Sequence, residues 1–256
     1  RIMSEVKRKK CLITGACGNF GRYLVKMLKA DYDLYLTDLR EEEVEGLPCR
    51  AVDLMNFSEL GAMMEGMDVV VHLAIASPRK FHKPGTPWVT EMGGYSTAML
   101  NTNVTGTYHV FEAAKTAGVK RVVFFSSLTV YFGNRKRLCY DESTSLEPAS
   151  LYACTKIFGE TLSGVYWREH GMSMVGLRIG QPYPSGCQEL DERCLHSRRA
   201  RSSYVALEDI ARAVCCAIET STEYGVFNIV SASDNQRYDL SPAAKIGYRP
   251  TGYFSE

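Results

Sequence analysis

The stretch "TGACGNFG", Thr14–Gly21, decides the fold. It places Gly15, Gly18 and Gly21 directly after the apolar run "KCLIT" and at the start of a segment with helical periodicity. Glycines at such a point let the backbone turn tightly and approach a pyrophosphate, whose charge is met by the amide groups of a helix N-terminus. The stretch therefore predicts a strand–turn–helix unit that binds a dinucleotide. The predicted cofactor-binding residues of this unit are Gly15, Gly18, Asn19, Phe20 and Gly21.

Short apolar, strand-like runs alternate with longer helix-like segments along the chain, and the stretches 77–95 and 180–203 interrupt this alternation. The expected strands are 10–16, 33–38, 49–53, 68–74, 121–127, 173–179 and 226–230, and the expected helices are 19–28, 57–64, 98–117, 151–169 and 207–219. This alternation predicts an α/β fold with a Rossmann-type doubly wound parallel sheet. We expect residues 1–178 to form the dinucleotide-binding domain and residues 179–256 to form a small C-terminal substrate lobe, interleaved with it.

Composition excludes several classes of function. The chain has 256 residues, 30 basic and 29 acidic, and this balance argues against a protein that binds nucleic-acid phosphates. Because no apolar stretch is long enough to cross a bilayer, we expect no membrane segment and a cytoplasmic location. Nine scattered cysteines include no Cys-x-x-Cys pair, so we expect reduced, mostly buried thiols and no metal site.

Asp38 closes the second expected strand, about twenty residues after the glycine turn. A carboxylate at this position accepts hydrogen bonds from the adenosine ribose hydroxyls and repels a 2′-phosphate. NAD is therefore favoured over NADP as the cofactor. Arg40, two residues further on, keeps the alternative open, since a guanidinium group binds phosphate well.

Several motifs occur in a fixed order: "TGACGNFG", "VDL" (Asp53–Leu54), "VHLA" (His72–Ala74), "NVTGT" from Asn103, "FFSSLTVY" and "YACTK". In this order the chain resembles the extended short-chain dehydrogenase/reductase superfamily, especially its NAD-dependent epimerase/dehydratase family. The resemblance implies a homodimer formed through the helices near residues 98–117 and 151–169. It also implies cofactor contacts from Asp53, Leu54, Leu73 and Ala74, and an active site ordered by Asn103.

A catalytic set is predicted around "SLYACTKIFGE", residues 150–160. Tyr152 and Lys156 share one helix face, so the Lys156 ammonium can favour the Tyr152 phenolate, and Tyr152 can accept a proton from a substrate alcohol. Ser127 ends the strand "RVVFFSS", and its hydroxyl can bind the reacting oxygen. Ser126 is the competitor, but Ser127 matches the family's catalytic Ser or Thr.

Two residues are expected to be structural despite their chemistry. His72 follows an apolar strand and is predicted to be a packed core histidine. Cys154 lies between Tyr152 and Lys156 with no His or Asp motif beside it, and it is predicted to contribute only to helix packing.

The substrate is predicted to be an anionic sugar-like compound. In the family, dehydratases carry an Asp-Glu pair where this chain has Leu128 and Thr129, so dehydration is disfavoured. The compact C-terminal region resembles uronate dehydrogenases, although those have Asn-His at Leu128-Thr129 and Ser at Gln181. Basic residues at 79–83 and 193–201 favour a carboxylate or phosphate. The predicted substrate contacts are Ser77, Ser127, Leu128, Gln181 and Arg193.

The sequence therefore predicts an NAD-dependent dehydrogenase that transfers a hydride from an alcohol or hemiacetal carbon of a sugar or sugar acid. Two alternatives stay open at this point. One is a nucleotide-sugar 4-epimerase, and the other is an NAD(P)-binding regulator without catalytic activity.

Overall fold

The structure is a computed structural model that describes residues 8–76, 94–133, 139–183 and 202–254. Its main sheet has eight strands, which lie side by side in the order β10 (Tyr224–Ile229), β7 (Ser173–Ile179), β6 (Arg121–Ser127), β5 (Val69–His72), β1 (Lys10–Thr14), β2 (Asp33–Asp38), β4 (Leu47–Ala51) and β3 (Glu42–Val44). Neighbouring strands pair in parallel, except for the edge strand β3, which is antiparallel to β4.

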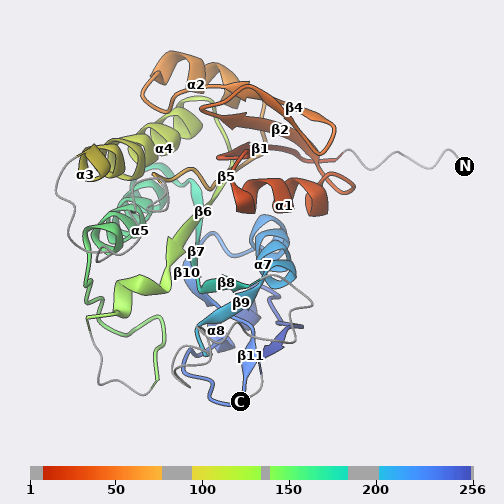
Figure 1. Cartoon of the computed structure of the whole chain (residues 1–256). Helices are drawn as coiled ribbons and strands as arrows, with labels where there is room; N and C mark the ends of the chain where they lie inside the picture. The colour runs from red at the N-terminus through yellow and green to blue at the C-terminus, as the bar shows by residue number, and fades with distance from the viewer. Residues whose placement is uncertain (1–7, 77–93, 134–138, 184–201, 255–256) are drawn as a thin grey trace, which may run out of the picture.

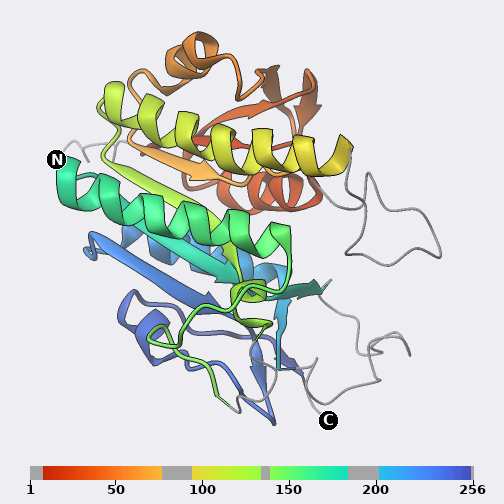
Figure 2. The same cartoon turned by 90° about the vertical axis from the view of Figure 1, so that its left-hand side faces the viewer.

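Helices cover both faces of this sheet (Figure 1). One face carries α1 (Asn19–Leu28) and α7 (Leu207–Glu219), and the other carries α2 (Phe57–Met64), α4 (Thr107–Thr116) and α5 (Leu151–His170). In Figure 2, α4 and α5 lie side by side across the sheet. The predicted Rossmann-type doubly wound α/β fold is confirmed.

Successive residues of the central strands supply two separate cores. Ile13, Val71 and Val123 pack with α1 and α7, whereas Leu12 and Val70 pack with α2, α4 and α5. Strand side chains alternate between the two faces, so a strand that is covered on both sides must be apolar at nearly every position. This is why the central strands read as continuous apolar runs.

The expected helix over residues 98–117 is more complex in the structure. It begins as α3 (Gly94–Met99), continues as the π-helical segment η2 (Leu100–Gly106) and ends as α4. A π-helical turn widens a helix and is common at functional sites. Gly106 permits close packing there, since a Cβ at this residue would lie 2.9 Å from the Leu54 side chain.

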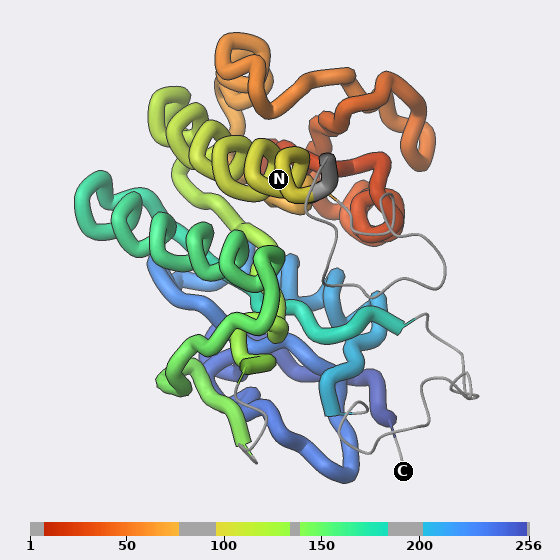
Figure 3. Tube along the Cα trace, turned by 60° about the vertical axis from the view of Figure 1, so that its left-hand side comes forward, coloured from red at the N-terminus to blue at the C-terminus, as the bar shows by residue number. Residues whose placement is uncertain are grey.

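The C-terminal segments gather at the carboxyl ends of β6, β7 and β10. They comprise the pairs β8 (Gln181–Tyr183) with β9 (Tyr204–Ala206) and β11 (Ala232–Ser233) with β12 (Tyr253–Phe254), and the short helix α8 (Ser241–Lys245). Figure 3 shows these segments, in turquoise (β8) and blue, beside the green segment that follows β6. The residues after 178 also supply strand β10 to the main sheet and helix α7 to one of its faces. A domain boundary after residue 178 therefore stays a prediction.

A buried carboxylate holds this region together. Asp209 on α7 is fully buried and accepts hydrogen bonds from Ser231 Oγ at 2.5 Å, from the Thr251 N–H at 2.7 Å and from the Gly252 N–H at 2.9 Å. Two separate segments, at Ser231 and at Thr251–Gly252, are thereby tied to α7. A buried carboxylate with several donors is stable because the donors replace its lost hydration.

Candidate active site

The glycine turn packs directly against the end of β5. Gly15 has a φ of 78°, and its N–H donates to the Thr37 carbonyl at 2.8 Å. A Cβ at Gly15 would lie 2.7 Å from the backbone nitrogen of Ala74, and a Cβ at Gly21 would collide with the carbonyl oxygen of Gly15. Only glycine fits at these two positions.

The N-terminus of α1 is open to an anion. Gly18 is its N-cap, no side chain caps it and its first turn contains no acidic residue. Free N–H groups and the helix dipole at such an end favour a phosphate group. This arrangement fits the pyrophosphate of a dinucleotide, and the contacts of Gly15, Gly18, Asn19, Phe20 and Gly21 with a cofactor stay predictions.

Asp38 lies beside this turn at the end of β2. Its Oδ2 accepts the Cys17 N–H at 3.0 Å, and its Oδ1 accepts the Leu39 N–H at 2.8 Å. The carboxylate is therefore fixed next to the glycine turn, where an adenosine ribose would bind. Arg40 also lies beside the glycine turn, since its Nη2 donates to the Cys17 carbonyl at 3.0 Å.

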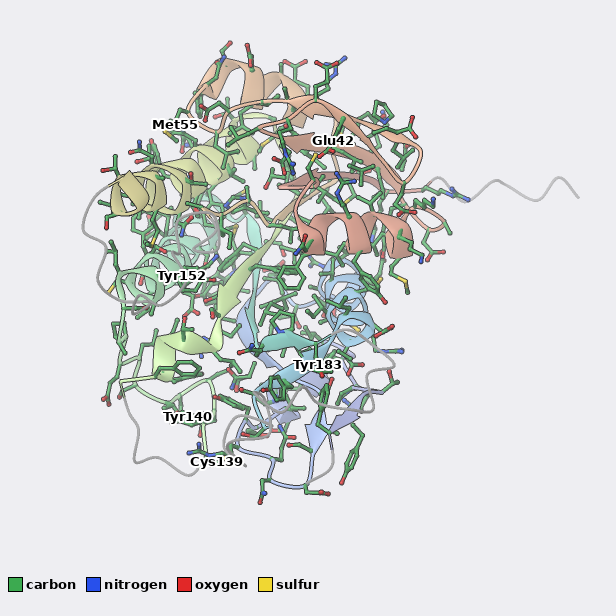
Figure 4. The ribbon with its side chains drawn as sticks, viewed as in Figure 1. Glu42, Met55, Cys139, Tyr140, Tyr152 and Tyr183 are labelled. Atoms are coloured by element: carbon green, nitrogen blue, oxygen red, sulfur yellow. The ribbon has the colours of Figure 1, made fainter. Side chains whose placement is uncertain are left out.

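The remaining predicted cofactor residues follow β4 and β5. Asp53 is exposed and accepts the N–H of Met55, which is labelled in Figure 4, at 2.9 Å. Leu54 is buried under Gly106, while Leu73 and Ala74 directly follow β5. The structure thus places all four near the carboxyl edge of the sheet, and their contacts with a cofactor stay predictions.

Asn103 joins two parts of the site from within the π-helical segment. Its Oδ1 accepts the Ala76 N–H at 2.9 Å, just after β5, and its Nδ2 donates to Thr155 Oγ1 at 3.2 Å on α5. Asn103 is 2% exposed. The residue therefore sets the position of α5 relative to the chain that follows β5.

Tyr152 and Lys156 lie on the first part of α5, which begins at Leu151 after the Ser150 cap. Lys156 Nζ lies 5.6 Å from the centroid of the Tyr152 ring and donates to the Phe125 carbonyl at 2.8 Å, next to the end of β6. Burial lowers the pKa of Lys156 to about 8. Figure 4 labels Tyr152 on this helix.

The two serines at the end of β6 have different partners. Ser126 Oγ donates to the buried Glu160 Oε1 at 2.5 Å, so its hydroxyl proton is engaged within the protein. Ser127 Oγ accepts hydrogen bonds from the N–H and the hydroxyl of Thr129, at 3.3 and 3.1 Å. In these contacts the Ser127 hydroxyl only accepts, and its own proton can still be donated to a substrate oxygen.

Sequence reasoning missed a buried ion pair that joins α5 to β7. Glu160 accepts from Arg178 Nε at 2.9 Å and from Arg178 Nη2 at 2.8 Å, and both side chains are 6% exposed. Arg178 also donates to the Tyr131 hydroxyl. The available signal was the position of Glu160, one helical turn after Lys156 on the same helix.

The predicted substrate contacts are placed unevenly. Leu128 is 2% exposed and packs with Val130 and Tyr131, so its side chain faces a small apolar core. Gln181 is exposed at the start of β8, and its N–H donates to the Ser203 carbonyl at 2.6 Å. Ser77 and Arg193, with the basic residues at 79–83 and 193–201, lie outside the described residues.

The two residues expected to be structural gave opposite results. His72 is 5% exposed, contacts Thr14 Oγ1 at 2.8 Å and Thr107 Oγ1 at 3.1 Å, and burial lowers its pKa to about 3. It is a neutral core histidine, as predicted. The prediction for Cys154 was wrong, because the side chain is exposed on the outer side of α5.

The other cysteines also depart from expectation. Among the seven in the described part of the chain, only Cys11, Cys17 and Cys49 are buried, so the prediction of mostly buried thiols was wrong. Within the same residues, no group of three or more His, Cys, Asp or Glu side chains is arranged to hold a metal ion. None of the helices described has the length and apolar character needed to span a membrane.

The fold and the glycine turn define a dinucleotide-binding α/β protein of the Rossmann type. Residues 11–230 match the model of the NAD dependent epimerase/dehydratase family, and the chain belongs to this family. This finding confirms the predicted family and, with it, an enzyme class that uses NAD.

Individual relatives agree with this assignment. The chain is 31% identical to an L-arabinose 1-dehydrogenase (NAD(P)(+)) of Haloferax volcanii, over 93% of this chain and 94% of the relative. It is 27% identical to a uronate dehydrogenase of Pseudomonas syringae pv. tomato, over 94% and 81% of the two chains. The crystal structure of a uronate dehydrogenase from Agrobacterium tumefaciens superimposes with a TM-score of 0.76 at 25% identity, over 96% of this chain and 85% of the other.

Proposed function

We propose that this protein is an NAD-dependent dehydrogenase that oxidises an alcohol or hemiacetal carbon of an anionic sugar-like substrate. The observation that carries the proposal is the buried Lys156 ammonium beside Tyr152, held by the Phe125 carbonyl at the end of β6. Bound NAD⁺ supplies the hydride acceptor. The relatives named above, which act by name on arabinose and uronate, support a sugar or sugar acid.

The protein side chains handle the proton and the substrate oxygen. Ser127 donates a hydrogen bond to that oxygen, the Lys156 ammonium stabilises the Tyr152 phenolate, and this phenolate accepts the hydroxyl proton. The substrate carbon loses a hydride and the oxygen loses a proton, so a carbonyl compound, NADH and one proton are formed. Glu160 and Arg178 take no part in this transfer, since they pair with each other.

The central test is Tyr152→Phe, which removes the hydroxyl and keeps the ring. Loss of general acid–base catalysis should lower kcat by at least about 100-fold, while NAD binding stays near the parental value. Tyr108→Phe on α4, where the side chain is 43% exposed, is the matched control and should retain full activity. Parental turnover of Tyr152→Phe would refute the mechanism.

The two serines provide a second test. Ser127→Ala should lower kcat strongly, because its hydroxyl acts on the substrate oxygen, and should reduce thermal stability less than Ser126→Ala, because it removes only the local contacts with Thr129. Ser126→Ala should instead lower the unfolding temperature, because it leaves Glu160 Oε1 with one donor fewer. A reversal of these two phenotypes would assign the catalytic role to Ser126.

A substrate panel separates the proposed dehydrogenase from the two alternatives. The protein is incubated with NAD⁺ and with uronates, sugar phosphates, neutral aldoses such as L-arabinose and nucleotide sugars. Accumulation of NADH with an acidic sugar supports the proposal. Isomer formation without net NADH identifies an epimerase, and binding of NAD without turnover identifies a regulator.

The proposal includes a homodimer in the cytoplasm, formed through α4 and α5. Apolar side chains are exposed on these neighbouring helices at Tyr108, Leu151 and Val165. An apolar surface of this kind favours self-association. Light scattering after gel filtration should give twice the chain mass, and Val165→Glu should yield the monomer.

A further inference from the structure

An ion-pair cluster lies beside Asp38 at the adenosine end of the proposed cofactor site. It consists of Arg22 on α1, Arg40 after β2 and Glu42 on β3, and we refer to these three residues as the Glu42 cluster. Figure 4 shows Glu42 between β4 and α1. Nothing in the proposed chemistry at Tyr152 requires this cluster.

One carboxylate serves both arginines. Glu42 Oε2 lies 2.5 Å from Arg22 Nη2, and Glu42 Oε1 lies 3.5 Å from Arg40 Nη2. Each carboxylate oxygen therefore faces a different guanidinium group. Guanidinium groups are the side chains best suited to bind phosphate. Here Arg22 is hydrogen-bonded to Glu42, and Arg40 forms a longer ion pair with it that is not a hydrogen bond.

The cluster is adjacent to the ribose site through a single residue of the glycine turn. The Cys17 N–H donates to Asp38 Oδ2 at 3.0 Å, and the Cys17 carbonyl accepts from Arg40 Nη2 at 3.0 Å. The Arg40 guanidinium is thus close to the carboxylate that is expected to bind the ribose hydroxyls. A 2′-phosphate on that ribose would therefore lie close to the Arg40 guanidinium.

Glu42 is held in place and is charged at neutral pH. β3 pairs antiparallel with β4, which sets Glu42 opposite Cys49. The Cys17 thiol and the Arg22 guanidinium hold the pKa of Glu42 below its ordinary value. The Arg22 and Arg40 side chains are 42% and 57% exposed, so both arginines remain accessible to a ligand once Glu42 is removed.

We propose that Glu42 is a specificity-determining residue: by pairing with Arg22 and Arg40, it withholds both guanidinium groups from a 2′-phosphate and so favours NAD over NADP. Asp38 repels the phosphate, and Glu42 removes the cations that would otherwise attract it. The relative named an L-arabinose 1-dehydrogenase (NAD(P)(+)) indicates that family membership alone does not fix this choice.

The test measures the Kd values of NADH and NADPH for the complete chain by fluorescence, without any sugar. Glu42→Ala should bind NADPH about tenfold more tightly than the parent, since one charge-assisted contact is gained, and NADH about equally well. Glu42→Gln keeps the side-chain volume and should shift the ratio in the same direction. Adenosine 2′,5′-bisphosphate and 5′-AMP serve as fragments that differ only in the 2′-phosphate.

Two controls decide the cause of any gain. Glu43→Ala removes the adjacent, exposed carboxylate of β3 and should leave the NADPH/NADH ratio unchanged. Adding Arg22→Ala and Arg40→Ala to Glu42→Ala should abolish the gain. An unchanged ratio in Glu42→Ala, the same gain in Glu43→Ala, or a gain that persists without both arginines would overturn the proposal.

This inference rests on the cofactor half of the proposed function and not on the substrate half. Because the readout is binding of free dinucleotides, a wrong sugar or an absence of turnover leaves the measurement intact. Conversely, an NADPH/NADH ratio that does not respond to Glu42 leaves the Tyr152 mechanism untouched.

Discussion

Two glutamates of this protein hold arginines in very different surroundings. Glu160 on α5 pairs with Arg178 on β7, where both side chains are 6% exposed. Glu42 pairs with Arg22 and Arg40 at the opposite part of the sheet, where the three side chains are 29%, 42% and 57% exposed. Both glutamates form carboxylate–guanidinium ion pairs, and the two sites differ in how deeply these pairs are buried.

Burial decides what each pair can do. A buried ion pair must be complete, because a charge left alone in the interior has lost its hydration without compensation. A partly exposed pair can be broken and rehydrated at little cost. The Glu160–Arg178 pair therefore stabilises the packing of α5 on β7. The Glu42 cluster contributes little to stability, and its arginines can instead affect which ligand binds.

The largest predicted effect is that of breaking the buried pair. Arg178→Ala should lower the free energy of unfolding by about 3–5 kcal/mol, because Glu160 would then be a buried carboxylate without its cation. Urea denaturation monitored by circular dichroism measures the change. The double variant Arg178→Met/Glu160→Leu should recover much of this lost stability. A loss below about 1 kcal/mol in Arg178→Ala would contradict a stabilising role of the buried pair.

A smaller change in the free energy of unfolding is expected when Lys156, which is also a buried charge on α5, is replaced. Its pKa of about 8 lies below the ordinary 10.5, so below pH 8 the folded protein bears the cost of a buried ammonium. Lys156→Met should therefore be inactive yet about 2 kcal/mol more stable than the parent at pH 7.

The pH dependence of this difference provides the check. Between pH 8 and 10.5 the folded parent has lost the Lys156 proton while the unfolded chain keeps it, so parental stability rises relative to the variant. The advantage of Lys156→Met should shrink across this interval. An advantage that stays constant with pH would show that burial of the ammonium is not its cause.

The smallest predicted effect is that of Glu42→Ala on stability. Because its ion pairs are partly exposed, the urea midpoint should stay close to that of the parent, while the NADPH/NADH ratio changes. Added salt tests the same point, because 0.5 M NaCl should screen the exposed arginines and reduce the gain in NADPH affinity of Glu42→Ala. If Glu42→Ala were as destabilising as Arg178→Ala, the distinction between the two regions would fail.

Much of the fold could be predicted because its signals are local. The bounds of α1 and α2 agree with the predicted segments 19–28 and 57–64, since helical periodicity and the glycine turn are contained within a few residues. Strands β1, β5 and β6 were visible as apolar runs. The π-helical turn and β3 were not predicted, because each depends on contacts with other segments and not on a pattern of its own.

The candidate site divides in the same way. Gly15, Asp38, Tyr152 and Lys156 could be selected by spacing and resemblance. The difference between Ser126 and Ser127 could not be derived from their adjacent positions, because it depends on a bond between Ser126 and Glu160, which is 34 residues away.

The sequence by itself determined the alternation of strands and helices, the dinucleotide turn and the positions of the predicted catalytic residues. Only the tertiary structure decided which charges are paired, how deeply they are buried and which serine hydroxyl is engaged. Glu42 meets Arg22 across 20 residues, and Glu160 meets Arg178 across 18. Periodicity and caps act over one or two helical turns, whereas the strength of an ion pair depends on distance and solvent exposure, which are set by the packing of segments far apart in the chain.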